Sequence, residues 1–176
     1  QSQANFTVVE DGIRFGLVAV KGVGRSFISG LLEERARGGM FRDFMDFCER
    51  MFHLDLNRRA LENLIRCGAF DRMGYRRAQL IQVFGQVLDG IAASRRRNLE
   101  GQMDLFGGGQ DGSERAPTLV LPNIPEFSQQ ELMSMERETT GLYLSGHPMD
   151  QYRELARRQG AVTISAIQSD LRREEG

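Results

Sequence analysis

Apolar residues recur with helical spacing through much of the first hundred positions. Phe27, Ile28, Leu31 and Leu32 fall on one face of a helix that ends at the glycine pair 38–39. Similar patterns predict helices from about residue 42 to 51 and from 58 to 66, with Asn57 as the cap of the second, and a longer helix around a stripe from residue 80 to 91. The chain is therefore predicted to be mainly α-helical, with a compact helical domain.

The start of the chain has a different pattern. Residues 6–9 are β-like and end at Asp11-Gly12, after which Ile13, Leu17 and Val20 have helical spacing up to Gly22. We expect a helix over residues 13–20, so that two helices joined by residues 21–24 form a hairpin.

The apolar periodicity is lost after residue 99. Residues 100–127 contain glycine clusters and three prolines, which predict a flexible linker between a helical domain at 1–99 and a helical extension at 128–160. In the extension, the Ser128–Glu131 sequence has the form of a capping box, Gly141 ends that helix, and a last helix follows Pro148 and ends at Gly160. Residues 161–176 are expected to lead into another domain.

Length and composition are those of an ordinary soluble domain. The chain has 176 residues, 40% of them hydrophobic, and no apolar run long enough to cross a bilayer, so we expect a cytoplasmic protein with no membrane partner. Because it begins with Gln1 and ends in a charged segment, it is expected to be a piece of a longer protein. Cys48 and Cys67 have apolar neighbours and are expected to be buried free thiols.

Charge is unevenly distributed although the net charge is only −1. Residues 53–100 hold nine Lys or Arg against five Asp or Glu, whereas residues 101–176 hold seven against twelve. The basic middle of the chain suits a polyanion such as nucleic acid. Solvated helix faces are the alternative explanation for the same arginines.

The turn between the first two expected helices is a candidate phosphate site. Gly22-Val23-Gly24 lets a ligand approach the backbone, the following helix offers free N–H groups, and Lys21 and Arg25 add positive charge. A second turn, residues 68–76, lacks the Gly-x-Gly form, and its case rests on its position and its arginines. A tight turn between helices would account for either pattern without a ligand. The predicted phosphate-binding residues are Lys21, Gly22, Val23, Gly24, Arg25, Arg72, Arg76 and Arg77.

A short apolar peptide lies inside the expected linker, with Gly101 before it and three glycines after it. Its residues are Gln102, Met103, Asp104, Leu105 and Phe106. Leu105 and Phe106 would each forgo roughly 1.5–3 kcal/mol of transfer free energy in water, and the glycine-rich flanks offer no core to receive them. The pattern predicts a peptide that binds a partner's pocket, and an ordinary disordered loop is the alternative.

Several segments, taken in order, resemble a known family. They are residues 13–17 (IRFGL), 21–24 (KGVG), 56–59 (LNRR), 68–71 (GAFD), 102–106 (QMDLF) and 141–148 (GLYLSGHP). The ordered set is similar to the bacterial DNA polymerase III alpha subunits, the C-family replicative polymerases, and the similarity covers essentially the whole chain. It corresponds to the region that follows the fingers, a tandem helix-hairpin-helix module, and ends at the edge of an oligonucleotide-binding barrel.

The resemblance implies a function in DNA replication. The first hairpin would track the backbone of duplex DNA, and residues 102–106 would be the internal peptide that binds the β sliding clamp. Other holoenzyme subunits would be met through the rest of the longer chain. The family's metal-binding carboxylates belong to the palm, so the resemblance implies no catalytic residue, metal or cofactor in this piece. The intact clamp peptide favours the main replicative paralogue over an error-prone one.

Other chemistry in the sequence is weak. Asp43 and Asp46 lack further metal ligands and are expected to be solvated, and Cys48 with His53 supplies only two of the roughly four ligands of a structural zinc site. His147 is expected to be a loop and cap residue. A helix-hairpin-helix glycosylase or nuclease remains an alternative and would need a catalytic Lys or Asp beside a hairpin, and a purely structural interdomain spacer is another.

Overall fold

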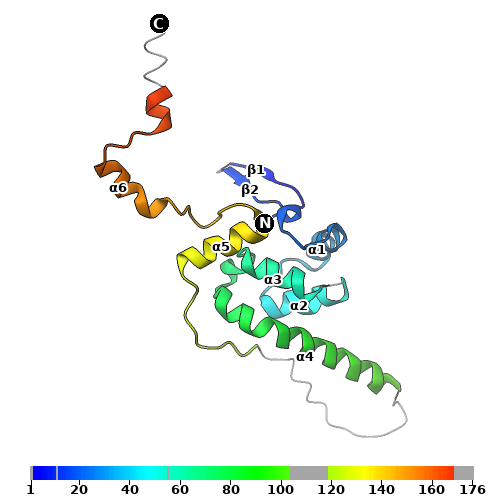
Figure 1. Cartoon of the computed structure of the whole chain (residues 1–176). Coiled ribbons are helices and arrows are strands. Elements are labelled where there is room, and N and C mark those ends of the chain that lie inside the picture. Colours follow the sequence, from blue (N-terminus) through cyan, green and yellow to red (C-terminus); the bar gives the residue numbers. More distant parts are fainter. Residues whose placement is uncertain (1, 11, 55, 104–118, 169–176) are drawn as a thin grey trace.

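The computed structural model describes residues 2–10, 12–54, 56–103 and 119–168, with only the backbone for residues 98–103 (Figure 1). The predicted mainly α class is confirmed. The elements, in order, are β1 (Thr7–Val9), β2 (Gly12–Arg14), the 3-10 helix η1 (Leu17–Ala19), α1 (Arg25–Gly38), α2 (Phe44–Met51), η2 (Phe52–Leu54), α3 (Arg58–Arg66), η3 (Asp71–Met73), α4 (Arg77–Met103), α5 (Gln129–Thr140), η4 (Asp150–Tyr152) and α6 (Arg153–Arg158).

The helix predicted over residues 13–20 is wrong. Ile13 instead lies in strand β2 and pairs with Val8 of β1 in an antiparallel hairpin, and only the single 3-10 turn η1 precedes the Lys21 turn. Gly12 has φ of 143°, a conformation that a hairpin bend permits and a helix does not. The amide of Leu17 donates to the carbonyl of Gln3 at 3.0 Å, so contacts with the N-terminal segment replace the expected helix.

Helix α3 lies at the centre of the molecule. It packs against α4 and α5, and α2 packs against α1 and α4 (Figure 1). Leu61, Leu64 and Ile65 on α3 are almost completely buried, as is Phe44 on α2. The amphipathic stripes read from the sequence therefore meet in one hydrophobic core.

The second predicted turn is part of that core. Phe70, in the connection between α3 and α4, makes edge-on contacts with the rings of Phe44 and Phe47 at centroid distances of 5.1 and 5.0 Å. Edge-to-face packing at this separation is favourable. The turn at residues 68–76 is thus an aromatic anchor between helices.

Several helix boundaries follow from side-chain caps. The side chain of Asn57 accepts a hydrogen bond from the amide of Ala60 at 2.8 Å, which confirms it as the cap of α3. Asp43 accepts from the amide of Asp46 at 2.8 Å, so α2 begins at Phe44 and not at residue 42. The predicted capping box at the start of α5 is present, and Gly141 ends that helix in the left-handed conformation.

Residues 100–127, which were predicted to form a flexible linker, have defined structure at both ends of that range. The backbone of α4 continues through Met103, and residues 119–127 lie against α4. The side chain of Gln79 donates to the carbonyl of Pro122 at 2.9 Å, and the carboxylate of Glu126 accepts from the amides of Arg77 and Ala78 at 2.7 and 3.0 Å. A carboxylate at this position stabilises the helix start through the free N–H groups and the helix dipole.

The C-terminal part extends away from the helical body (Figure 1). The predicted helix after Pro148 is present as η4 and α6, and Gly160, with φ of 75°, follows it. A further helical turn covers residues 164–168. Met149, Tyr152 and Leu155 in this part of the chain are exposed.

Candidate nucleic-acid interface

The turn from Lys21 to Arg25 projects its backbone into solvent at the start of α1. Gly22 has φ of 76°, which an L-residue adopts only with strain, and Gly24 is the N-cap of α1 with extended backbone angles. Lys21, Gly22, Gly24 and Arg25 are exposed, whereas Val23 is buried in the core. Five of the predicted site residues are thus brought together by a turn that one apolar side chain anchors.

Two neighbouring helices hold this turn in place. The amide of Lys21 donates to the carbonyl of Thr139, near the end of α5, at 2.8 Å. The carbonyl of Lys21 accepts a hydrogen bond from the side-chain amide of Asn63, on α3, at 2.6 Å. The conformation of the turn is therefore set by segments that lie far from it in sequence.

The N-terminus of α1 has no negative group of its own. No side chain caps it, and its first turn contains no acidic residue. In the described part of the chain, the amides of Gly22, Gly24 and Arg25 have no hydrogen-bond acceptor. Free N–H groups and an uncompensated positive helix end together favour an anion.

Arg59 borders this site, although it is not among the residues predicted from the sequence to bind phosphate. A Cβ built on Gly22 would lie 3.4 Å from Nε of Arg59 and 2.8 Å from Nδ2 of Asn63, so both α3 side chains border the glycine turn. Arg59 and Asn63 are four residues apart on a helix and therefore share a face. This spacing is visible in the sequence, but nothing in it shows that the face points towards Gly22.

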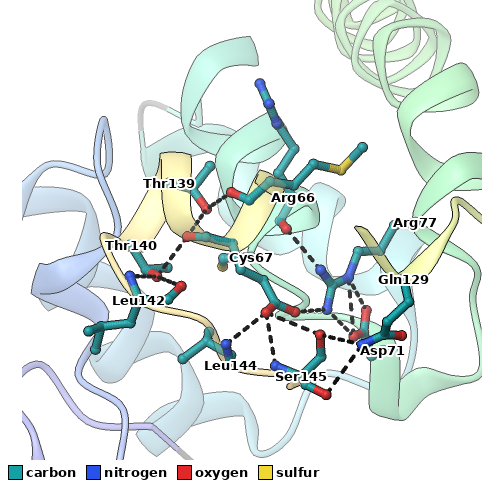
Figure 2. A network of polar contacts seen from close by, with 12 residues as sticks. Arg66, Cys67, Asp71, Arg77, Gln129, Thr139, Thr140, Leu142, Leu144 and Ser145 are labelled. Carbon is teal, nitrogen blue, oxygen red and sulfur yellow. Dashed lines mark hydrogen bonds and ion pairs between the residues drawn. The ribbon is translucent and has the colours of Figure 1, made fainter. Parts of the chain in front are cut away.

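Arg77, which was predicted to bind phosphate, is instead a buried structural residue. Its guanidinium contacts the carboxylate of Asp71 at 2.6 Å and that of Glu136 at 2.9 Å, and it donates to the carbonyl of Arg66 at 3.1 Å (Figure 2). Its side chain is only 6% exposed. We therefore remove Arg77 from the predicted site, because its donors are occupied and shielded from solvent.

The other two arginines of the second turn remain on the surface. Arg76 is exposed and uses one donor on the carbonyl of Ile124 at 2.6 Å. Arg72 is exposed and forms no ion pair with any residue that the structure describes. Both stay predictions as phosphate contacts, but at the second turn the amides of Arg77 and Ala78 are already bound by the carboxylate of Glu126.

Glu136 is the residue that links Arg77 to the segment after α5. Its carboxylate is completely buried and accepts hydrogen bonds from the amides of Leu144 and Ser145 at 2.7 and 2.8 Å, besides its contact with Arg77. Burial opposes its ionisation, but these hydrogen bonds outweigh that effect and hold the pKa of Glu136 below its ordinary value of 4.5. The ionised carboxylate thus joins α4, α5 and the segment after α5.

Comparison with known proteins is consistent with this arrangement. Residues 1–80 match the family model described as a helix-hairpin-helix motif. DNA polymerase III subunit alpha of Mycobacterium tuberculosis (strain CDC 1551 / Oshkosh) is 35% identical over 169 residues, which cover 95% of this chain and 14% of that protein. The same subunit of Escherichia coli (strain K12) is 40% identical over 162 residues, covering 91% of this chain and 14% of that protein.

This chain belongs to the DNA polymerase III alpha subunits. It corresponds to one segment of them, because it spans about 14% of the length of these curated relatives. The family resemblance stated from the sequence is confirmed, and the helix-hairpin-helix region lies in the part of the chain that carries the Lys21 turn.

The predicted clamp peptide of this alpha-subunit segment begins at the end of α4, and its last three residues lie outside the described residues. Gln102 and Met103 lie at the C-terminal end of α4, and Asp104, Leu105 and Phe106 lie outside the described residues. Ile91 is the last buried residue of α4 among those with described side chains. The helix therefore continues beyond the core for roughly 18 Å up to Met103, at a rise of about 1.5 Å per residue.

The remaining candidate groups are structural. Asp46 was expected to be solvated but is buried, and it contacts Arg50 at 3.3 Å and the amide of Arg42 at 2.9 Å. Within the described ranges, no three His, Cys, Asp or Glu side chains are placed to hold a metal ion. No described helix is both long and apolar enough to cross a membrane.

Burial dominates the chemistry of the two thiols. It raises the pKa of Cys67 to about 11 and that of Cys48 further still. The Sγ of Cys67 also donates to the carbonyl of Leu64 at 3.3 Å. Both cysteines are free, as predicted; Cys48 is buried as expected, whereas Cys67 is half-buried against the core.

Proposed function

We propose that this segment of the alpha subunit binds the sugar–phosphate backbone of duplex DNA without reading its sequence, and that it docks the polymerase on the β sliding clamp. The segment itself would carry no catalytic residue and no cofactor. Polymerisation would belong to other parts of the longer protein.

The observation that carries the DNA-binding proposal is the exposed turn from Lys21 to Arg25. Backbone amides and two cations lie together there, and the first turn of α1 contains no acidic residue. Backbone amides and cationic side chains recognise phosphate oxygens, which are the same at every base pair. Such contacts position a protein on DNA and let it slide, as a processive polymerase must.

Charge reversal at the turn tests this function. Lys21→Glu combined with Arg25→Glu should weaken duplex binding for every sequence alike and should make it less salt-dependent. Each lost phosphate contact lowers the slope of log K against log salt by about 0.9. The measurement is a fluorescence-anisotropy titration of the whole chain with two unrelated duplexes at several salt concentrations.

Two surface arginines provide a control with the same change of charge. Arg157 and Arg158 lie on α6, are exposed, and pair only with Glu154 among the described residues. Arg157→Glu combined with Arg158→Glu should leave the salt slope of the wild type unchanged. Loss confined to one of the duplexes, or an equal loss in the control, would contradict the assignment.

Docking on the sliding clamp is supported by the sequence of the peptide and by the helix that leads to it. Gln102 and Met103 end a helix that has already left the core, and Leu105 and Phe106 follow at once in the sequence. A few large apolar anchors carry most of the affinity of such peptides. Tethering to a ring around the duplex would raise the effective concentration at the primer end to about the millimolar range.

The two attachments serve one purpose. Phosphate contacts alone are weak and decline with salt, whereas a clamp contact alone does not orient the protein on the duplex. Their combination would hold the polymerase near the primer end through many cycles of addition. A chain that binds neither duplex DNA nor clamp would instead be an interdomain spacer.

A further inference from the structure

Helix α3 borders the glycine turn with two side chains that lie one helical turn apart. A Cβ built on Gly22 would lie 2.8 Å from Nδ2 of Asn63 and 3.4 Å from Nε of Arg59. The turn therefore lies beside α3, and its Lys21 amide is bound by the end of α5.

Asn63 acts on the backbone of the turn. Its side-chain amide donates to the carbonyl of Lys21 at 2.6 Å, while the amide of Lys21 is held by the carbonyl of Thr139 at 2.8 Å on the other side. The N–H and C=O groups of Lys21 are thus both occupied, whereas the amides of Gly22, Gly24 and Arg25 have no acceptor among the described residues. Asn63 thus fixes the orientation of the Lys21 carbonyl and contributes no charge.

Arg59 brings charge to the same place. Its side chain is exposed and forms no ion pair within the described part of the chain. Its neighbour Arg58 is also exposed, but it points towards α4 and pairs with Asp89 at 2.6 Å. Two adjacent arginines therefore differ in one respect: the charge of Arg58 is partly neutralised and that of Arg59 is not.

We propose that Arg59 is a third cationic contact to the DNA backbone at this turn, beside Lys21 and Arg25, and that Asn63 is a positioning residue for the turn. This inference rests on the proposed DNA-binding function. Three cations suit a run of phosphates on one strand better than a single phosphate, because each strand carries one charge per about 3.4 Å of helix axis.

The two hairpins would then contribute unequally to phosphate binding. A tandem arrangement suggests one phosphate site at each turn, yet Arg77 of the second turn is internal and its Phe70 is in the core. The helix that enters the second turn, α3, serves the first turn through Arg59 and Asn63. Both motifs thus contribute to one site.

The test compares Arg59→Ala with Arg58→Ala in the whole chain. Affinity for a mixed-sequence duplex is measured from about 50 to about 200 mM salt, a range in which each phosphate contact changes the affinity by about 3.5-fold. Arg59→Ala should lower the slope of log K against log salt by about 0.9, and Arg58→Ala should leave it at the wild-type value.

Asn63→Ala tests the positioning role with a different readout. It should weaken binding at every salt concentration while the slope stays that of the wild type, because no charge is removed. Thermal unfolding of each variant is followed by circular dichroism, so that affinities are compared below the onset of unfolding.

The outcomes separate this inference from the function on which it rests. Absence of duplex binding by the wild-type chain would overturn the proposed function. Wild-type binding that depends on Lys21 and Arg25, together with an unchanged slope in Arg59→Ala, would overturn only the role of Arg59. An equal decrease of slope in Arg58→Ala would also overturn it, and a decreased slope in Asn63→Ala would overturn the positioning role.

Discussion

Nη2 of Arg77, at the start of α4, lies 2.9 Å from Oε1 of Glu136, within α5. Fifty-nine residues of sequence separate them, and both are buried. The pair fastens α5 onto the helical domain, and α5 in turn holds the Lys21 turn through the carbonyl of Thr139. A buried ion pair thus supports the geometry of the candidate interface.

Glu136→Gln should destabilise the chain at neutral pH by roughly 3 kcal/mol, because it leaves the buried Arg77 without its full partner. Chemical unfolding followed by circular dichroism at pH 7 measures the change. Glu138→Gln is the control, since Glu138 is exposed and pairs with Arg66 at the surface. That change should cost less than about 1 kcal/mol, and equal costs for both would contradict the role of Glu136.

The same residue should contribute to acid unfolding. Folding lowers the pKa of Glu136 below its ordinary value of 4.5. The ionised carboxylate therefore stabilises the fold at pH values above 4.5, and this stabilisation is lost as the pH falls through the folded pKa. The free energy of unfolding of the wild type should therefore decrease as the solution is acidified below about pH 4.5. Glu136→Gln should show a shallower decrease, and parallel curves for the two proteins would count against this cause.

Gly22→Ala should damage both stability and DNA binding. Its φ of 76° is strained for alanine, and the new Cβ would lie 2.8 Å from Nδ2 of Asn63. We expect a loss of roughly 1–2 kcal/mol in the free energy of unfolding and weaker duplex binding. Gly90→Ala is the matched control, because Gly90 lies within α4 with nothing within 4 Å of its added Cβ. It should stabilise the chain by roughly 0.5–1 kcal/mol.

Leu105→Ala combined with Phe106→Ala should abolish binding to the purified sliding clamp and leave affinity for duplex DNA nearly unchanged. The two anchors would carry most of the contact with the clamp, whereas the phosphate contacts lie at the Lys21 turn. Isothermal titration calorimetry with the clamp measures the first effect. Val8→Ala with Ile13→Ala removes two other exposed apolar side chains and should bind like the wild type. Undiminished clamp binding by the first variant would end the assignment.

The two cysteines should react slowly with a thiol reagent in the native chain at pH 8. Burial raises the pKa of Cys67 to about 11 and raises that of Cys48 as well, so little thiolate is present and access is restricted. Absorbance after addition of the disulfide reagent DTNB should rise slowly, and fast release of two equivalents should follow unfolding in urea. Fast reaction of the native protein would show that the helices do not cover these thiols.

Local patterns in the sequence were enough for most of the helices. Asn57, Ser128 with Glu131, and Gly141 mark helix ends through hydrogen bonds and dihedral angles that involve only nearby residues. The glycine turn with Lys21 and Arg25 was also recognisable, because its composition, its φ requirement and its position before a helix are local properties. The mainly α class followed from such patterns, whereas the family was identified by the resemblance of an ordered set of segments.

Only the tertiary structure decided which residues pack against or pair with one another across the chain. Ile13 belongs to an apolar pattern with helical spacing, yet it pairs with Val8 in a β-hairpin. Arg77 was predicted to contact DNA, yet it is buried against Asp71 and Glu136. Arg59 is part of the candidate site only because it lies beside Gly22. Sequence alone determined most of the helices and the glycine turn that can meet an anion, because periodicity and capping act over a few positions. Glu136 lies 59 residues from Arg77 and Asn63 lies 42 residues from Lys21, and only the packing of α3, α4 and α5 brings these residues together.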